Sequence, residues 1–192
     1  MRQIYFSGDK MKIALCLSGQ IRSYQKSYEY YLKNLIENND VDVFIHTWNI
    51  DTDIYTELNT FNQLKETFKP KSFSLSKQFP EDQFKNYTVI DERWPAKNTF
   101  QMWYSVFKAN ELKREHELTN GFKYDMVVRT RFDFALNTKI DLNIEKNKLY
   151  VPNDLIKGTI DPNQMAANDQ FAYGDSDVMD LYSQTFWNID RA

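Results

Sequence analysis

Three charged side chains stand at alternate positions directly after a short apolar run. The run is Met126–Val128, and the charges are Arg129, Arg131 and Asp133. A continuous apolar run indicates a buried strand, and side chains alternate across a strand, so we expect these charges to project from one face. Buried charges are unfavourable unless they are paired, bind a metal or face a ligand. The pattern predicts an anion and metal site at the end of a strand. The alternative is an internal Arg–Asp ion pair where the strand leaves the sheet.

The chemistry that suits these residues is the binding of a phosphorylated ligand, held partly through a divalent cation. Carboxylate oxygens favour Mg²⁺ or Mn²⁺, and both ions fill their remaining positions with phosphate and water. Asp133 is the predicted metal ligand, and the fixed donor forks of Arg129 and Arg131 fit phosphate oxygens. Asp169, after a loop-like segment, is either a base for an acceptor hydroxyl or a turn residue that caps the segment after it.

A second polar segment, Ser18–Arg22, follows the first predicted strand, Lys12–Leu17. Its single glycine, Gly19, indicates a tight turn into a helix. Such a turn directs backbone N–H groups and a helix N-terminus toward a place where an anion can bind. Arg22 either adds to this site or is an ordinary surface residue of the first helical turn.

A third polar segment, His46–Asp51, ends the second predicted strand. His46 is interpreted as a core histidine with satisfied hydrogen bonds, in preference to a ligand. Trp48 lies either at the rim of a pocket or over the core.

Hydrophobic spacing predicts the elements that position these three segments. We expect strands at 12–17, 41–47, 72–75, 124–134 and up to 174, helices at 24–36, 54–68, 98–120 and 176–186, and a long surface loop, a possible lid, at 76–96. Alternating strands and helices indicate right-handed βαβ units and a mainly parallel sheet. Such sheets bind ligands at the carboxyl ends of their strands, so the three segments are expected to meet at one edge.

The helix before the charged strand carries further expectations. Asn98 and Gln101 resemble a capping box at its start. Near its end, Lys113–Glu117 is expected to be solvated, with His116 at the surface. Gly121 is expected to end the helix.

Length and composition limit the class of protein. A chain of 192 residues suits one domain with a substantial core, which we place at 12–192 after a lead-in at 1–11. The net charge of −3 gives no basic field for general nucleic-acid binding, and one cysteine excludes an internal disulfide and a cysteine-based zinc site. No apolar run approaches the roughly 18 residues of a membrane span, and no signal peptide is evident, so we expect a cytoplasmic protein.

Five short motifs make the chain resemble the GT-A glycosyltransferases, and more closely the small GT-A-like proteins that large phages and viruses encode. The motifs are Leu17–Arg22, Phe44–Asn49, Met102–Ser105, Arg129–Asp133 and Asn168–Gly174. The resemblance extends over most of the chain from Lys12 to Phe186. It implies a single Rossmann-like α/β domain of the GT-A type, with a mainly parallel central sheet flanked by helices. For a phage-encoded member it implies the cytoplasm of a host cell.

The resemblance also implies metal-dependent transfer of a sugar from a nucleotide-diphosphate sugar, in first place a UDP-sugar, to a carbohydrate or other hydroxyl acceptor. Asp133 would coordinate Mn²⁺ or Mg²⁺, because Arg131–Asp133 occupies the place of the family's Asp-x-Asp motif, whose first Asp is Arg131 here. Asp169 would be catalytic, since it matches a later acidic residue that faces the acceptor. The residues implied to bind the nucleotide-sugar are Leu17, Ser18, Gly19, Gln20, Arg22, Trp48, Lys97, Asn98, Arg129 and Arg131.

Two other functions stay open. One is a weakly active or non-catalytic nucleotide- or glycan-binding module of the same fold, supported by the missing first Asp and the small size. The other is a nucleotidyltransferase or phosphotransferase, which would normally need more carboxylates or a clearer phosphate loop. No histidine follows His116, although the family has a late histidine metal ligand, which leaves open whether a C-terminal segment is missing.

Overall fold

The computed structural model describes residues 10–49, 54–84, 95–152 and 169–189. Along the chain the elements are β1 (Lys12–Gly19), α1 (Tyr24–Tyr31), a π-helical turn η1 (Leu32–Ile36), β2 (Asp40–Trp48), α2 (Ile54–Phe68), β3 (Ser72–Ser76), a 3-10 turn η2 (Glu81–Phe84), α3 (Ala96–Asn120), β4 (Met126–Thr130), β5 (Phe171–Gly174), α4 (Ser176–Ser183) and α5 (Thr185–Asn188).

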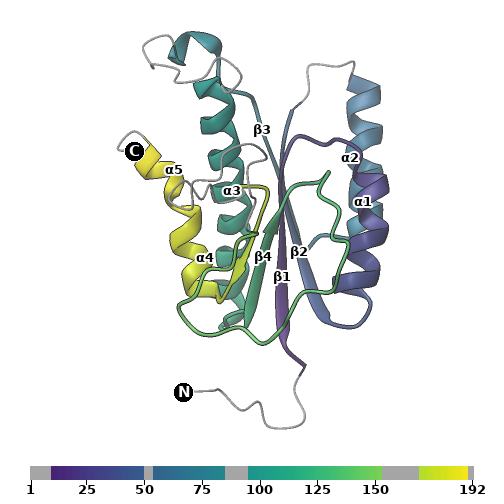
Figure 1. The fold of residues 1–192 in the computed structure, drawn as a ribbon. Helices are drawn as coiled ribbons and strands as arrows, with labels where there is room; N and C mark the ends of the chain where they lie inside the picture. The colour runs from purple at the N-terminus through teal and green to yellow at the C-terminus, as the bar shows by residue number, and fades with distance from the viewer. Residues whose placement is uncertain (1–9, 50–53, 85–94, 153–168, 190–192) are drawn as a thin grey trace, which may run out of the picture.

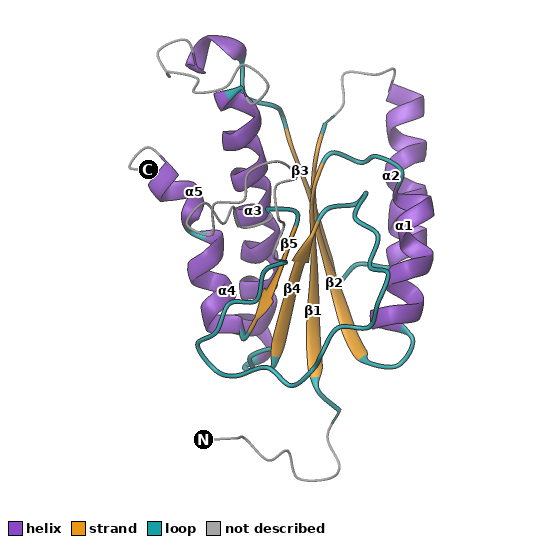
Figure 2. Ribbon diagram, in the orientation of Figure 1, coloured by secondary structure: helices purple, strands orange, loops and turns teal. Residues whose placement is uncertain are grey.

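These strands form one sheet in the order β3-β2-β1-β4-β5. The pairs β3–β2, β2–β1 and β1–β4 are parallel, and β5 runs antiparallel to β4. Figures 1 and 2 show the sheet between two layers of helices, with α1 and α2 on one side and α3 and α4 on the other. The prediction of a Rossmann-like α/β domain with a mainly parallel sheet is confirmed.

The central strand β1 is buried on both faces. Ile13, Leu15 and Leu17 pack in the cluster that includes side chains of α1 and α2. Ala14 and Cys16 point the other way, into the cluster that includes side chains of α3 and α4. This alternation is the period of a strand, and two covered faces explain why its sequence is continuously apolar. Cys16 is a buried free thiol as predicted, and burial raises its pKa to about 12.

The predicted capping box at the start of α3 is wrong. The helix begins at Ala96, with Pro95 as its N-cap, and no side chain caps it. Because the helix starts before Asn98, that residue lies inside the first turn, and Gln101 is buried. The predicted end is confirmed: Gly121 has the left-handed φ of 68°, and its N–H donates to the carbonyl of Glu117.

The prediction that Lys113–Glu117 is solvated is confirmed for Glu115, which is exposed, but it is wrong for Lys113 and Glu117, which are buried. Lys113 is fully buried, and its Nζ donates to the carboxylates of Glu117 at 3.1 Å and Asp180 at 2.7 Å and to the hydroxyl of Ser176 at 2.7 Å. All three ammonium donors are thereby satisfied, which offsets the desolvation of the charge. Two of the partners lie 63 and 67 positions further along the chain, in α4, so local sequence could not show this burial.

His116 is half-buried, whereas the sequence predicted a surface position. Its ring stacks on Tyr124 with an interplanar angle of 22° and also contacts the rings of Phe44 and Phe122. These aromatic neighbours come from β2 and from the segment after α3, and they cover one side of the imidazole.

Several predictions fall on residues outside the described ranges. Of the predicted loop at 76–96, residues 85–94 lie outside them, so its role as a lid stays a prediction. Residues 1–9 of the predicted lead-in also lie outside them, and the domain boundary is likewise untested. Among the helices of the described part of the chain, none has the length and apolar character needed to cross a membrane.

Candidate functional site

The strand order reverses at β1. β2 lies on one side of it and β4 on the other, with Leu17 of β1 opposite Thr130 of β4 near their carboxyl ends. In open α/β sheets, ligands bind in the crevice outside the carboxyl ends of strands at such a switch point. The turn after β1 and the residues after β4 flank this position.

The turn after β1 is fixed from two sides. Gly19 has a φ of +108°, which side chains rarely tolerate, so a glycine is required here. Its N–H donates to the hydroxyl of Ser105 on α3 at 2.7 Å, and its carbonyl accepts from the hydroxyl of Thr47 on β2 at 2.9 Å. The turn is therefore held in one conformation by the neighbouring helix and strand.

His46 is a core residue, as interpreted from the sequence. Its Nδ1 lies 2.7 Å from the hydroxyl of Ser105 and its Nε2 3.0 Å from that of Ser76. Burial, with a smaller effect from the charge of Lys108, lowers the pKa of His46 to about 3, so the ring is neutral at pH 7. Trp48 packs edge-on against His46 and is itself buried, yet it also lines the cavity described next.

A cavity of about 590 Å³ lies at this edge of the sheet. Its walls come from the β1 turn, the end of β2, the first turns of α3, the end of β4 and the turn before β5. The lining residues are Ser18, Gly19, Gln20, Arg22, Trp48, Asn98, Thr99, Gln101, Met102, Trp103, Arg129, Arg131 and Asp169. Every site residue expected from the sequence is among them, except three.

The three exceptions have different reasons. Leu17 is fully buried in the hydrophobic cluster between the sheet and the helices α1 and α2. Lys97 pairs with Glu81 at 2.5 Å. Asp133 does not line the cavity, but it binds Arg131, which does.

Arg129 is the one residue of the charged motif that lies within β4. It is 2% exposed, and its Nη1 donates to the main-chain carbonyl of Asp169, joining the end of β4 to the turn before β5. Its Nε has no hydrogen-bond partner among the residues that the structure describes. Burial, the largest cause, lowers the pKa of the guanidinium, although the charge of Asp169 raises it.

Beyond Arg129 the predicted extended face is wrong, because β4 ends at Thr130 and the chain turns at 132–133. The turn brings the guanidinium of Arg131 against the carboxylate of Asp133. Arg131 donates two hydrogen bonds to it, from Nε to Oδ1 at 2.9 Å and from Nη2 to Oδ2 at 2.8 Å. The alternative interpretation, an internal Arg–Asp ion pair where the strand leaves the sheet, is confirmed. Partial burial would raise the pKa of Asp133, but Arg131, and Arg22 at 3.4 Å, bring it below its usual value.

The described residues do not fit a metal ion held by protein side chains. Both oxygens of Asp133 accept hydrogen bonds from Arg131, and a cation there would lie against the guanidiniums of Arg131 and Arg22. Within the ranges that the structure describes, no three His, Cys, Asp or Glu residues are grouped so as to hold a metal. The predicted role of Asp133 as a ligand of Mn²⁺ or Mg²⁺ stays a prediction that this geometry does not support.

In the described part of the chain, three buried polar atoms at the cavity have no hydrogen-bond partner. They are Ser18 Oγ, Gln101 Nε2 and Arg129 Nε, on residues that are 1%, 6% and 2% exposed. An unpaired buried polar group costs about 1–3 kcal/mol, so a ligand that supplies partners would recover this energy. Sequence reasoning did not place Gln101 in the site, nor Thr99, Met102 and Trp103. The available signal was a glutamine between Phe100 and Met102 in the first turns of a predicted helix.

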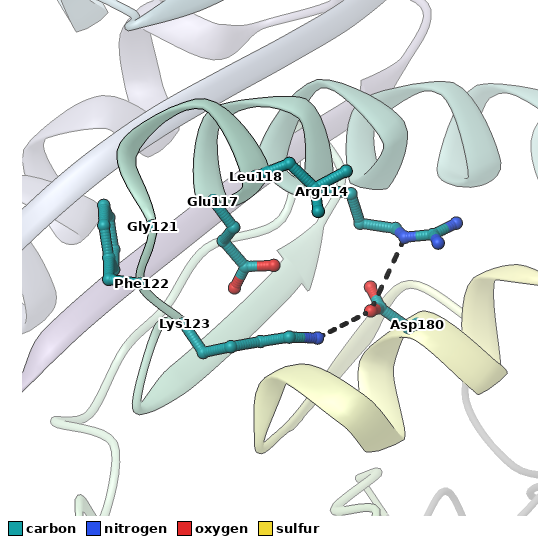
Figure 3. Close-up of a pocket in the computed structure, with 7 residues that line it drawn as sticks. All are labelled: Arg114, Glu117, Leu118, Gly121, Phe122, Lys123 and Asp180. Carbon is teal, nitrogen blue, oxygen red and sulfur yellow. Dashed lines mark hydrogen bonds and ion pairs between the residues drawn. The ribbon is translucent and has the colours of Figure 1, made fainter.

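A second cavity, of about 360 Å³, lies at the other end of α3 (Figure 3). Figure 3 shows Arg114 and Lys123 converging on Asp180, with ion-pair distances of 3.6 and 3.4 Å. Asp180 also accepts from the buried Lys113. These charges are paired with one another, which indicates a structural role in joining α3 to α4.

A mainly parallel α/β sheet with a cavity at the β1/β4 switch point defines a Rossmann-like α/β domain. The chain belongs to the family described as "Domain of unknown function (DUF7796)", whose sequence profile matches residues 8–181. No curated protein matches the chain. Among solved structures it is similar to the one titled "Crystal structure of the glycosyltransferase GlyE in Streptococcus pneumoniae TIGR4", at 11% identity and a TM-score of 0.38. That likeness covers 95% of this chain and only 38% of the other.

Proposed function

We propose that the protein is a glycosyltransferase, which moves a sugar from a nucleotide-diphosphate sugar, in first place a UDP-sugar, to a hydroxyl group of a carbohydrate or other acceptor. The observation that carries the proposal is the cavity at the carboxyl ends of β1 and β4. Among the described residues, three arginines and one carboxylate line it, namely Arg22, Arg129, Arg131 and Asp169, and this group stays positive when Asp133, which pairs with Arg131, is counted. Arginine forks in a partly buried site suit the oxygens of a diphosphate.

The rest of the cavity suits the neutral parts of such a ligand. Met102 and Trp103 provide an apolar wall, on which a base or a sugar ring can pack. The unpaired polar atoms of Ser18 and Gln101 can bond the polar edge of a base or the hydroxyls of a sugar. A nucleotide-sugar combines these features in one molecule.

Asp169 is the proposed catalytic base. Its side chain is exposed and lines the cavity, where an acceptor could approach. The acceptor oxygen would attack the anomeric carbon while its proton passes to the Asp169 carboxylate. The bond from that carbon to the diphosphate breaks, and the arginines stabilise the charge left on the nucleoside diphosphate. This role suits inversion of configuration at the anomeric carbon.

The first experiment is calorimetric titration of UDP, GDP, ADP and CDP into the folded protein, followed by a transfer assay with sugars of the nucleotide that binds. We expect one nucleoside diphosphate to bind at least about tenfold more tightly than the others. The absence of binding by any of them would contradict the proposal.

A second candidate is a nucleotide- or glycan-binding module without catalysis. The observation that favours it is the Arg131–Asp133 ion pair, which stands where the resembled family has two carboxylates. Nucleotide binding without turnover of any nucleotide-sugar, or glycan binding without nucleotide binding, would support this candidate. The narrower likeness to phage-encoded members stays a prediction.

A further inference from the structure

We infer that the cavity binds the diphosphate of its ligand through arginines and without a metal ion, and that Asp133 is a positioning residue that holds Arg131 in place. The inference rests on the proposed function for its choice of a diphosphate. It departs from the sequence-based expectation that Asp133 coordinates Mn²⁺ or Mg²⁺.

The first argument is that the carboxylate of Asp133 is already engaged. Arg131 occupies both of its oxygens in a bidentate pair, and Arg22 lies 3.4 Å from Oδ2. The side chains of Asp133 and Arg131 are only 21% and 28% exposed, so water screens this pair less than it would a surface pair. A metal ion would have to displace a guanidinium and then remain beside two of them.

The second argument is that the pair leaves part of Arg131 available. Nε and Nη2 donate to Asp133, whereas Nη1 takes no part in that interaction. Because Arg131 also lines the cavity, its remaining donors can bond an anion there. Asp133 thus fixes the guanidinium before a ligand arrives, which lowers the entropy cost of binding.

The third argument concerns Arg129 and the charge of the cavity. Arg129 is buried, and its Nε has no partner within the described ranges, so an anion would supply the missing hydrogen bond and offset the cost of the buried charge. Arg22, whose side chain is 56% exposed, adds a third guanidinium. A divalent cation would lie beside the guanidiniums of Arg131 and Arg22 and be repelled by them, whereas the free donors of the three arginines can bond the diphosphate oxygens directly.

The test is calorimetric titration of inorganic pyrophosphate into the full chain, in EDTA and separately with excess Mn²⁺. We expect binding in EDTA, within about threefold of the affinity with Mn²⁺. Arg131→Lys keeps the charge but loses the fork, and should weaken binding at least about tenfold. Asp133→Asn should weaken it about threefold, because the amide can orient Arg131 only in part. Arg114→Lys, at the other end of α3, is the matched control and should leave the affinity unchanged.

Each other outcome decides the question. Pyrophosphate binding that requires Mn²⁺ and is lost in Asp133→Asn overturns the inference in favour of a metal site, and no binding in either buffer also overturns it. Titration of UDP in the same two buffers distinguishes a failure of the inference from a failure of the proposed function. If pyrophosphate binds in EDTA and UDP binds no more tightly, the inferred arginine site is supported and the proposed nucleotide ligand is wrong. If UDP binds only with Mn²⁺, the proposed nucleotide ligand is supported and the inference of a metal-free arginine site is wrong.

Discussion

At Arg129, the stability of the fold and the proposed binding of a ligand make opposite demands on one side chain. It is 2% exposed in β4, and no described residue is a hydrogen-bond partner of its Nε. Within the described part of the chain, no carboxylate forms an ion pair with it. A buried charge of this kind is often less stable than an apolar side chain of similar volume. Retaining it therefore favours a role in binding over a role in folding.

Arg129→Met should raise the free energy of unfolding by about 1–2 kcal/mol, because the desolvated charge is removed. The same change should weaken the binding of pyrophosphate or UDP at least about tenfold, since a charge-assisted donor is lost. Urea unfolding and calorimetry measure the two effects. Arg114→Met, in a half-exposed ion pair, is the control and should change stability by less than about 1 kcal/mol. A less stable Arg129→Met with normal binding would show that the residue is purely structural.

Asp169→Asn should lower the rate of sugar transfer by about 10²–10⁴-fold, because the amide cannot accept the proton of the acceptor hydroxyl. Donor affinity should hardly change, since the group that Arg129 binds is the main-chain carbonyl of Asp169. Initial rates at saturating donor, together with calorimetry, check this separation. Asp177→Asn, on the exposed side of α4, provides the control. Normal turnover in Asp169→Asn, or transfer with retention of configuration, would exclude the proposed base.

At the scale of elements, α3 connects the two ends of the molecule. Its first turns supply Asn98 and Gln101 to the cavity, and its centre supplies Ser105 to the turn after β1. Its last turns bury Lys113 against α4. Because one rigid helix carries all three contacts, a change that loosens α4 can reach the cavity through α3.

Lys113→Met should destabilise the protein by about 3–5 kcal/mol, because Glu117 would then lie buried without its cation. Lys123→Met removes an exposed lysine that also pairs with Asp180, and should cost less than about 1 kcal/mol. Urea unfolding of both variants at pH 7 measures the contrast. Equal losses would mean that burial does not set the strength of this network.

At the scale of the whole molecule, the sequence predicted the features that depend on local hydrophobic period and on the alternation of strands with helices. Strands with continuous apolar runs and helices with regular spacing indicated the parallel sheet, and the polar ends of β1 and β4 indicated the edge where the cavity lies. The sequence did not show which interactions form between segments that lie far apart along the chain. The burial of Lys113 depends on Ser176 and Asp180, and the role of Ser105 depends on Gly19 and His46. β4 ends early because the chain turns where Arg131 pairs with Asp133, whereas an extended chain would hold their side chains apart. The local sequence pattern fits both conformations.

The stability of the whole domain should fall in mild acid because of His46. Its pKa is about 3 in the folded state and close to 6.5 in the unfolded chain. Below pH 6.5 the unfolded chain therefore takes up a proton that the folded chain does not, and about 3 kcal/mol should be lost by pH 4.5. Urea unfolding from pH 7 to 4.5 measures the slope, and His46→Gln should flatten it. Equal slopes in both proteins would show that the ring is protonated when folded.

The network around Lys113 also bears on how the chain folds during its synthesis. A ribosome releases β1 to β4 together with α3 before it releases α4, so the nascent sheet can begin to pair while Ser176 and Asp180 are still within the exit tunnel. Until they emerge, two of the three partners of the Lys113 ammonium are missing, and the end of α3 has to remain open to water. The last contact to form would then be the one between α3 and α4, and a pause in translation before residue 176 would prolong a partly folded intermediate.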